Sequence, residues 1–288
     1  MVRWRLSTLA VCCAVVVGLS AAPVAAREQE RDRGDDQATY LALGDSVAFG
    51  TNPLLDANNQ ANFVGYPEAL ARKLELRLTN ASCPGEASGG FISLSGTDNL
   101  CRPYRANFPL HVSYKSSQLD FAVAFLLSHP DTRLVTLNVG ANDFFALQKQ
   151  CSFDPVCVSN GFSGMVSTLA ANLQTIYGRL RGEAHYRHRL VGLTYYALNY
   201  TDPVGVGLDL AVNQVIATTT LAAGGRVADG FGKWQTVAMK SGGDSCAAGL
   251  LIVLPNTNPR VCDDHPAPLG RDLLADAIAD ALRSGGDD

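Results

Sequence analysis

The sequence predicts an α/β protein built on one parallel β-sheet with helices on both faces. Short apolar segments typical of buried strands alternate along the chain with longer segments of helical periodicity, which is the pattern of repeated βαβ units. Several of the apolar segments end in turns that contain Gly, Asp or Asn. With 288 residues, 47% of them hydrophobic, the chain is long enough to bury a sizeable core.

The elements follow one another in regular order. The first expected strand covers residues 39–43 and ends at Gly44, which permits a sharp turn. Helix 66–74 has Pro67 in its first turn, and residues 75–80 alternate as a strand does. The remaining elements, assigned from apolar spacing and end signals, are helix 117–128, strand 134–139, helix 164–181, strand 189–196, helix 208–223, strand 226–229 and helix 269–282. No linker or repeat interrupts them, which indicates a single domain at 39–283.

Residues 1–26 have the pattern of a secretory signal peptide. Arg3 and Arg5 give the positive start, an apolar run covers 9–19, and Val24-Ala25-Ala26 is a small-residue cleavage site. The apolar run is too short to predict a membrane span. We therefore expect a secreted protein with no stable membrane anchor.

The polar residues 27–38 predict a disordered arm before the domain, and 284–288 form a short tail. Cys12 and Cys13 leave a lipoprotein anchor as an alternative, which we disfavour because both lie early in the apolar run rather than at its end. The formal net charge of −4 and the lack of a long basic segment argue against a nucleic-acid partner.

The cysteine count predicts disulfides. Of the eight cysteines, Cys12 and Cys13 belong to the signal, which leaves six (8 − 2), and an even number in an exported chain favours disulfide pairing. The simplest scheme joins neighbours: Cys83–Cys101, Cys151–Cys157 and Cys246–Cys262. A metal site is disfavoured because paired Cys-x-x-Cys spacing with nearby histidines is absent.

Gly44-Asp45-Ser46 places a serine between an expected strand and an expected helix. Ser46 has two interpretations there. It can cap a connection without chemical function, or it can be a nucleophile at a helix N-terminus, where the helix dipole favours developing negative charge. Ligands of open α/β sheets bind at this carboxyl edge of the strands.

Three further turns can meet Ser46 at the same edge: the turn at Gly85, the turn at Asn142 and the turn at His265. Each also has an interpretation without chemical function: Gly85 can belong to an ordinary Pro-Gly turn, Asn142 can be a helix cap, and His265 can be a loop histidine. Together they supply what a serine nucleophile needs. His265 is the base, and the backbone N–H of Ser46, the backbone N–H of Gly85 and the side-chain amide of Asn142 are three oxyanion donors.

These four blocks resemble the SGNH hydrolases, also called the GDSL esterase/lipase family. The matching segments, in order, are Ala42-Leu43-Gly44-Asp45-Ser46, Asn80-Ala81-Ser82-Cys83-Pro84-Gly85-Glu86, Gly140-Ala141-Asn142-Asp143 and the block that ends at His265. The second has the form seen in secreted bacterial members. The resemblance runs from about residue 40 to 282 and implies a flavodoxin-like three-layer α/β fold, ester hydrolysis and no cofactor.

One position departs from the family pattern. The acid that usually precedes the histidine by three residues is replaced by Cys262, while Asp263 and Asp264 lie two and one residues before His265. We expect Asp263 to orient His265, with a backbone carbonyl as the alternative. Asp264 is the weaker candidate because an adjacent side chain reaches the ring poorly. A Cys246–Cys262 disulfide would brace this loop.

The leading hypothesis is a secreted esterase or lipase that forms an acyl-enzyme on Ser46 and acts as a monomer on lipid or acylated carbohydrate esters. A carbohydrate acetyl esterase, a phospholipase and a non-catalytic ligand-binding protein are the alternatives. Loops 52–65, 88–113 and 200–207 should shape the acyl and alcohol pockets. Candidates for an apolar lining, equally explained as core, are Phe49, Phe63, Phe91, Phe144 and Phe145.

Overall fold

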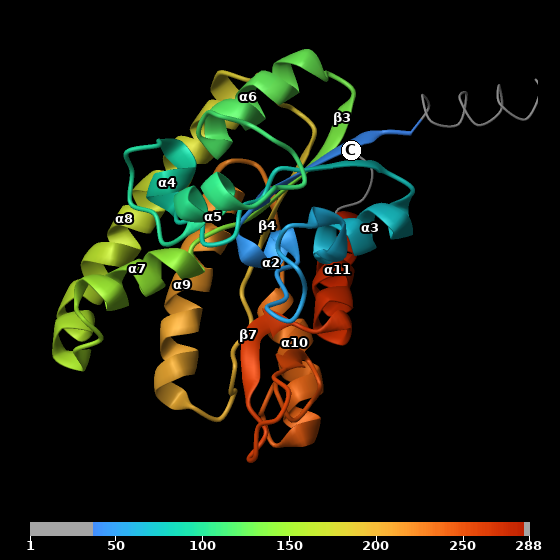
Figure 1. The fold of residues 1–288 in the computed structure, drawn as a ribbon. Coiled ribbons are helices and arrows are strands. Elements are labelled where there is room, and N and C mark those ends of the chain that lie inside the picture. The colour runs from blue at the N-terminus through green and yellow to red at the C-terminus, as the bar shows by residue number, and fades with distance from the viewer. Residues whose placement is uncertain (1–36, 285–288) are drawn as a thin grey trace, which may run out of the picture. The chain divides into compact units, whose positions relative to one another are not determined.

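The computed structural model describes residues 37–284 (Figure 1). Within them, five strands form one parallel sheet in the order β2-β1-β3-β4-β5. The strands are β1 (Thr39–Gly44), β2 (Arg77–Asn80), β3 (Thr132–Asn138), β4 (Arg189–Leu193) and β5 (Arg226–Ala228). This is the flavodoxin-like strand order, so the predicted fold class is confirmed. The expected signal peptide, the Cys12 or Cys13 anchor and nearly all of the arm and tail lie outside the described residues.

Two layers of helices cover the sheet. In one layer, α3 (Tyr66–Leu74) and α10 (Gly230–Ala238) pack against α11 (Pro268–Arg283), which contacts β4 and β5. In the other, α8 (Pro155–Gly182) packs between α6 (Gln118–Ser128) and α9 (Pro203–Ala222). Parallel strands need such crossover helices, and the helices bury both faces of the sheet.

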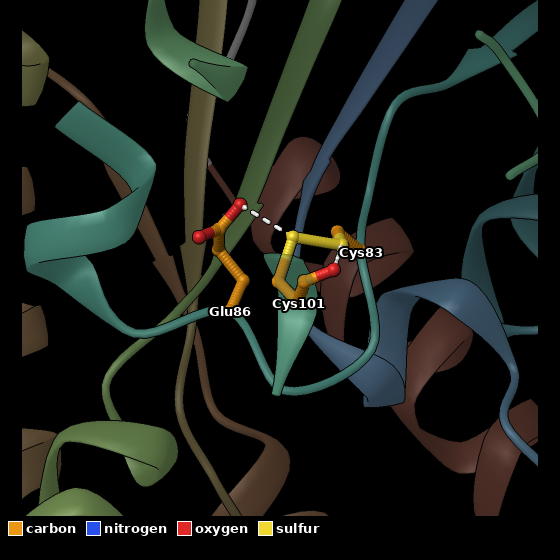
Figure 2. Close-up of side chains that lie close together, drawn as sticks. All are labelled: Cys83, Glu86 and Cys101. Carbon is orange, nitrogen blue, oxygen red and sulfur yellow. Dashed lines mark hydrogen bonds between the residues drawn. A yellow bond between two sulfur atoms is a disulfide. The ribbon is translucent and has the colours of Figure 1, made fainter. Parts of the chain in front are cut away.

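Shorter elements gather around the loops that follow the strands. They are α2 (Ser46–Phe49), η1 (Gln60–Asn62), α4 (Ser88–Ile92), α5 (Cys101–Asn107), α7 (Ala141–Gln150), η2 (Met239–Ser241) and an antiparallel pair, β6 (Leu251–Val253) and β7 (Cys262–Pro266). Three disulfides join the described cysteines as Cys83–Cys101, Cys151–Cys157 and Cys246–Cys262. Figure 2 shows the first of them beside Glu86.

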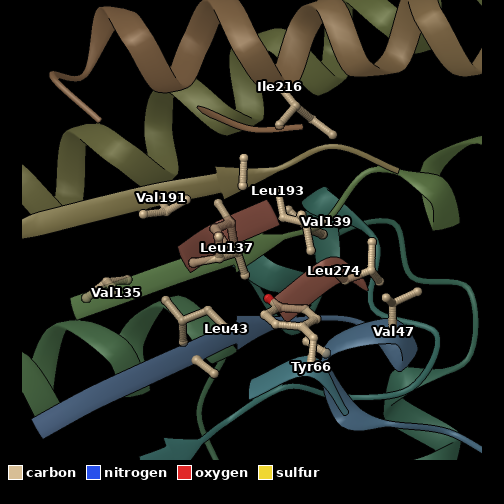
Figure 3. Close-up of a cluster of buried hydrophobic side chains, with 14 of the residues drawn as sticks. Leu43, Val47, Tyr66, Val135, Leu137, Val139, Val191, Leu193, Ile216 and Leu274 are labelled. Carbon is tan, nitrogen blue, oxygen red and sulfur yellow. The ribbon is translucent and has the colours of Figure 1, made fainter. Parts of the chain in front are cut away.

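The core lies between the sheet and its helices. Figure 3 draws part of it, with Leu137 of β3, Leu193 of β4, Ile216 of α9 and Leu274 of α11. All six residues of β1 are buried, as expected for a central strand of a parallel sheet. A buried β1 holds the turn that follows it, and with it Ser46, in a fixed place.

Helix α9 is the one helix of the described residues that is long and apolar enough to cross a membrane by length and composition. It packs against β4, β5 and α8 and buries Val212 and Ile216. A third of its most apolar window is buried inside the protein, so α9 packs on the sheet through one face.

The structure corrects several expected boundaries. Helix α8 begins at Pro155 rather than 164, and α9 begins at Pro203 inside the expected loop 200–207. Each starts with a capping Asp followed by Pro, a strong start signal that the glycines of the next two turns obscured. The expected strand 189–196 ends at Leu193, and the expected loop 88–113 contains α4 and α5.

The block around His265 was expected to be a turn, and that expectation is wrong. His265 lies in β7, which pairs with β6 near the Cys246–Cys262 disulfide. β6 has three residues, too few to show a two-residue alternation, and the five residues of β7 are mostly polar and end in Pro, so they show no apolar alternation either. The histidine therefore comes from a separate hairpin and not from a strand of the main sheet.

Candidate active site

A cavity of about 300 Å³ opens at the carboxyl ends of the central strands. Ser46, Asn142 and His265 all line it, although they lie far apart in the sequence. Gly85, the fourth expected site residue, is not part of the lining. Three of the four therefore line one cavity. The parallel topology predicts this for the turns of Ser46 and Asn142, whereas the β6–β7 hairpin brings His265 there.

Ser46 begins helix α2 directly after β1. Gly44 has φ 144°, and a Cβ there would lie 2.3 Å from the backbone oxygen of Asn138 on β3, so glycine is required. The side chain of Gln118 holds the turn, because its Oε1 accepts from Gly44 N at 2.7 Å and its Nε2 donates to Gly44 O at 3.0 Å. Asp45 Oδ1 caps α2 by accepting from Val47 N. These bonds fix the position of the serine.

Asn142 lies in the first turn of α7 and is bonded at both ends of its amide. Its Nδ2 donates to Asp45 Oδ2 at 3.2 Å, and its Oδ1 accepts from Asn99 Nδ2 at 2.8 Å. Tyr195 OH also donates to Asp45 Oδ2, at 2.5 Å. Burial raises the pKa of Asp45 to about 6, although the hydrogen bonds from Tyr195 and Val47 oppose the rise.

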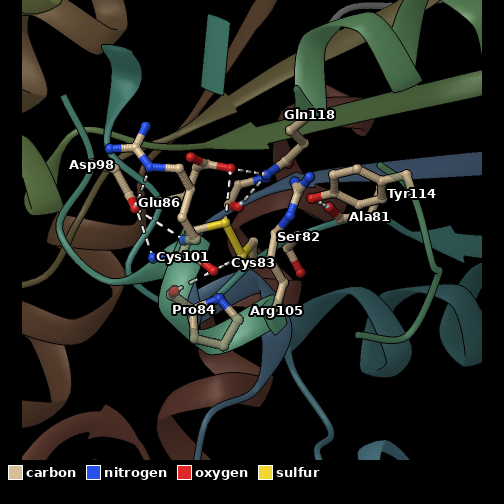
Figure 4. The surroundings of a disulfide bond; sticks show 12 residues. Ala81, Ser82, Cys83, Pro84, Glu86, Asp98, Cys101, Arg105, Tyr114 and Gln118 are labelled. Carbon is tan, nitrogen blue, oxygen red and sulfur yellow. Dashed lines mark hydrogen bonds and ion pairs between the residues drawn. A yellow bond between two sulfur atoms is a disulfide. The ribbon is translucent and has the colours of Figure 1, made fainter. Parts of the chain in front are cut away.

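The Cys83–Cys101 disulfide, drawn in Figure 4, closes a loop. Gly85 belongs to this loop. Its φ is +80°, and a Cβ would fall 2.5 Å from Leu100 Cβ. Its carbonyl oxygen accepts from the backbone N–H groups of Asn99 and Leu100. The next residue, Glu86, is buried, and its Oε2 accepts from Gln118 Nε2. Gln118 thereby links this loop to the Ser46 turn.

Glu86 is a buried acid in that loop. Burial and the neighbouring Asp98 raise its pKa to about 8. Its Oε2 also lies 3.3 Å from Cys101 Sγ (Figure 2). Cys83, Glu86 and Cys101 form a compact group of potential ligand atoms, but the two sulfurs are joined to each other and are not free thiolates.

His265 is held by two carboxylates. Its Nδ1 lies 2.5 Å from Asp263 Oδ1, which also accepts from the backbone N of His265. Asp264 Oδ1, which we expected to reach the ring poorly, lies 3.1 Å from the same nitrogen. Burial lowers the pKa of His265, but the two carboxylates outweigh it and raise the pKa to about 9.

Two tyrosines after β4 support this edge of the sheet. Tyr196 OH donates to the backbone oxygen of Asp264 at 2.6 Å, and its ring stacks on buried Trp234 with centroids 3.7 Å apart. Tyr195 bonds Asp45. Both tyrosines lie at the end of the expected strand 189–196, where the sequence predicted no role for them. Their position was a usable signal, because the hydroxyl of a buried tyrosine usually has a hydrogen-bond partner.

The rest of the cavity wall is largely apolar, with Phe144, Phe145, Phe162, Leu198, Leu208 and Val212 among its residues. Of the phenylalanines that the sequence suggested, Phe49, Phe63 and Phe91 are instead buried in the core. Loop 200–207 contributes Asp202 and Gly205, whereas loops 52–65 and 88–113 contribute no lining residue. The wall is thus formed mainly by α7, by α9 and by the segment between β4 and α9, while α8 contributes Phe162.

Two acids interrupt this wall. Asp202 caps α9, and Asp209 lies two turns further along the helix. Burial and the nearby charge of Asp202 raise the pKa of Asp209 to about 7. Neither Lys nor Arg lines the cavity in the described part of the chain, so its electrostatic character is acidic.

The five-stranded parallel sheet with helices on both faces has the α/β fold of the SGNH hydrolases. The profile of the GDSL-like lipase/acylhydrolase family matches residues 42–270, and the chain belongs to this family. No curated protein matches the chain.

Solved structures share the fold at low sequence identity. Phospholipase A1 from Streptomyces albidoflavus NA297 is 19% identical, with a TM-score of 0.54 over 85% of this chain and 99% of its own. The lipase Lip_vut3 from a goat rumen metagenome is 14% identical (TM-score 0.52; 85% and 97%). The acetylxylan esterase Axe2 from Geobacillus stearothermophilus is 15% identical (TM-score 0.50; 87% and 95%).

Proposed function

We propose that this hydrolase is a serine ester hydrolase that forms an acyl-enzyme on Ser46. The observation that carries the proposal is the shared cavity of Ser46, Asn142 and His265, with Asp263 2.5 Å from the imidazole Nδ1. A nucleophile, a base, an acid that orients the base and an oxyanion donor are the parts that acyl transfer requires.

The reaction proceeds in two steps. Ser46 Oγ attacks the ester carbonyl while His265 Nε2 accepts the hydroxyl proton, and the same proton then goes to the departing alcohol. Water, deprotonated by His265, next attacks the acyl-enzyme, and the acid is released as the imidazolium returns the proton to Ser46 Oγ. In both steps the oxyanion accepts hydrogen bonds from the N–H group of Ser46 and from Asn142 Nδ2, both of which belong to residues that line the cavity. Gly85 is the third proposed donor, although it is not among the lining residues.

The cavity favours an apolar acyl group. Its 300 Å³ lies at the lower end of the range for small-molecule sites, and phenylalanines and aliphatic side chains form much of its wall. Lipid and other apolar esters therefore rank ahead of acetylated carbohydrates. The phospholipase A1 and the acetylxylan esterase that share the fold define two substrate classes to compare with simple esters.

A chain-length series of p-nitrophenyl esters, from acetate to decanoate, tests the mechanism. The wild type should hydrolyse the series with a preference for chains longer than acetate, and Ser46→Ala should lose the activity. Ser95→Ala, which changes an exposed serine outside the cavity, is the matched control and should behave as wild type. Activity that survives Ser46→Ala would contradict the mechanism.

Secretion and a monomeric state without a membrane anchor are part of the same proposal. Three disulfides are typical of proteins from oxidising compartments, and a signal peptide at 1–26 would supply the export. Terminal sequencing of protein recovered from the culture medium should begin after Ala26. An intact N-terminus on a cell-associated protein would contradict it.

A further inference from the structure

Asn99 belongs to none of the four sequence blocks, yet it contacts two of them. Its backbone N donates to Gly85 O at 3.2 Å, and its side-chain Nδ2 donates to Asn142 Oδ1 at 2.8 Å. We propose that Asn99 is a positioning residue of the oxyanion hole, which orients the Asn142 amide and ties it to the Gly85 turn. This inference rests on the proposed function.

The orientation of the Asn142 amide matters because its two ends have similar shapes and opposite hydrogen-bonding character. Only the Nδ2 end can stabilise an oxyanion. One Nδ2 hydrogen is directed to Asp45 Oδ2, so the second is available to the cavity that Asn142 lines. With the amide reversed, a carbonyl oxygen would face the developing negative charge.

Asp45, whose carboxylate only accepts, selects this orientation, and Asn99 Nδ2 holds it from the opposite end. If the Asn142 amide were reversed, its N–H would face the N–H of Asn99, and its oxygen would face the carboxylate oxygen of Asp45. Asp45 is held in turn by Tyr195 OH and Val47 N. In a buried network of this kind, a mismatched pair loses hydrogen bonds without compensation from water. Asn142 is 4% exposed, so the two contacts define its donor direction.

The Asn99 side chain contributes little else to the structure of the loop. Its Oδ1 has no hydrogen-bond partner, so the amide contributes its one bond to Asn142. The loop itself is held by backbone bonds to Gly85 O, by the Cys83–Cys101 disulfide and by Asp98, whose carboxylate accepts from Cys101 N and Arg102 N (Figure 4 shows the first). Truncation of Asn99 therefore removes the Asn142 contact and leaves the loop bonded.

A double-mutant cycle between Asn99 and Asn142 tests the proposal on a p-nitrophenyl ester. Asn99→Ala should lower kcat by about 10- to 100-fold, less than the roughly 100- to 1,000-fold typical for loss of a whole donor, with little change in KM. In the Asn142→Ala background the same substitution should change kcat by less than about twofold, because residues that act through one another are not additive.

Asn99→Asp keeps the size of the side chain and replaces the donor by an acceptor, so it should lower kcat at least as far as Asn99→Ala. Asn107→Ala is the matched control: it removes an exposed amide at the end of α5, outside the cavity, whose Nδ2 donates to Pro103 O, and kcat should stay near wild type. Circular dichroism and Tm, measured for each variant, separate loss of fold from loss of rate.

Wild-type kcat in folded Asn99→Ala or Asn99→Asp would overturn the proposal, and so would an equal loss of kcat in both backgrounds. Ser46→Ala, assayed in parallel, separates the two claims. If Ser46→Ala is inactive and the Asn99 variants keep the wild-type kcat, only the proposed role of Asn99 is contradicted. If Ser46→Ala keeps activity, the proposed function fails.

Discussion

Replacement of Asp263 by Asn tests how His265 is held as a base. Asp263 Oδ1 and Asp264 Oδ1 lie 2.5 and 3.1 Å from its Nδ1. Burial opposes the charged ring, yet the two carboxylates raise its pKa from 6.5 to about 9. This rise corresponds to about 3 kcal/mol in favour of the imidazolium, at about 1.4 kcal/mol for each pH unit.

The assay is kcat/KM against pH, which reports groups of the free enzyme. Because the neutral imidazole is the base, wild-type kcat/KM should rise with pH to a midpoint near 9. Asp263→Asn should move the midpoint toward 6.5 and lower the plateau by up to about 10⁴-fold, the loss that follows when a triad histidine loses its acid. Asp264→Asn is the matched control and should change both less.

An unchanged midpoint and plateau in Asp263→Asn would refute this reasoning and favour a backbone carbonyl as the orienting group. A larger effect in Asp264→Asn would transfer the role to the neighbouring acid.

Three further predictions follow from other parts of the molecule. The pKa of Glu86 is about 8 in the fold and near 4.5 in the unfolded chain, so the free energy of unfolding should fall as the pH rises from 4.5 to 8. Glu86→Gln should flatten the decline of Tm between pH 6 and 9, and an unchanged slope would contradict this prediction. Reduction of Cys246–Cys262, which closes the hairpin of His265, should lower activity before the sheet unfolds by circular dichroism, whereas full activity in reductant would exclude that brace. Asp209→Asn removes one of the two carboxylates that interrupt the apolar wall and should raise the rate on p-nitrophenyl glutarate relative to the butyrate ester at pH 8 by about 3- to 10-fold, in line with the repulsion of about 1 kcal/mol between two like charges about 4 Å apart in water; an unchanged ratio would place Asp209 outside the acyl path.

The alternation of strands and helices could be predicted because it depends on local patterns. Apolar strands such as residues 134–139 and amphipathic helices such as 66–74 carry their period within a few residues. The strand-end position of Ser46 and the turn at Asn142 follow from the same reasoning, since parallel strands bring their carboxyl ends to one edge.

What the sequence did not reveal depends on contacts between distant segments. Nothing local distinguishes Asn99 or Gln118 from other polar residues, and their roles emerge only when Asn142 and Gly44 come within 3 Å of them. The β6–β7 hairpin has the same character, because two very short strands are defined by each other and by a disulfide rather than by their own period.

The most direct test of the central claim is the intact mass of the protein after exposure to a p-nitrophenyl phosphonate, followed by peptide mapping. The account predicts one adduct on Ser46, formed by the wild type and absent from Ser46→Ala. An adduct on another residue, or no adduct while esters are still hydrolysed, would contradict it.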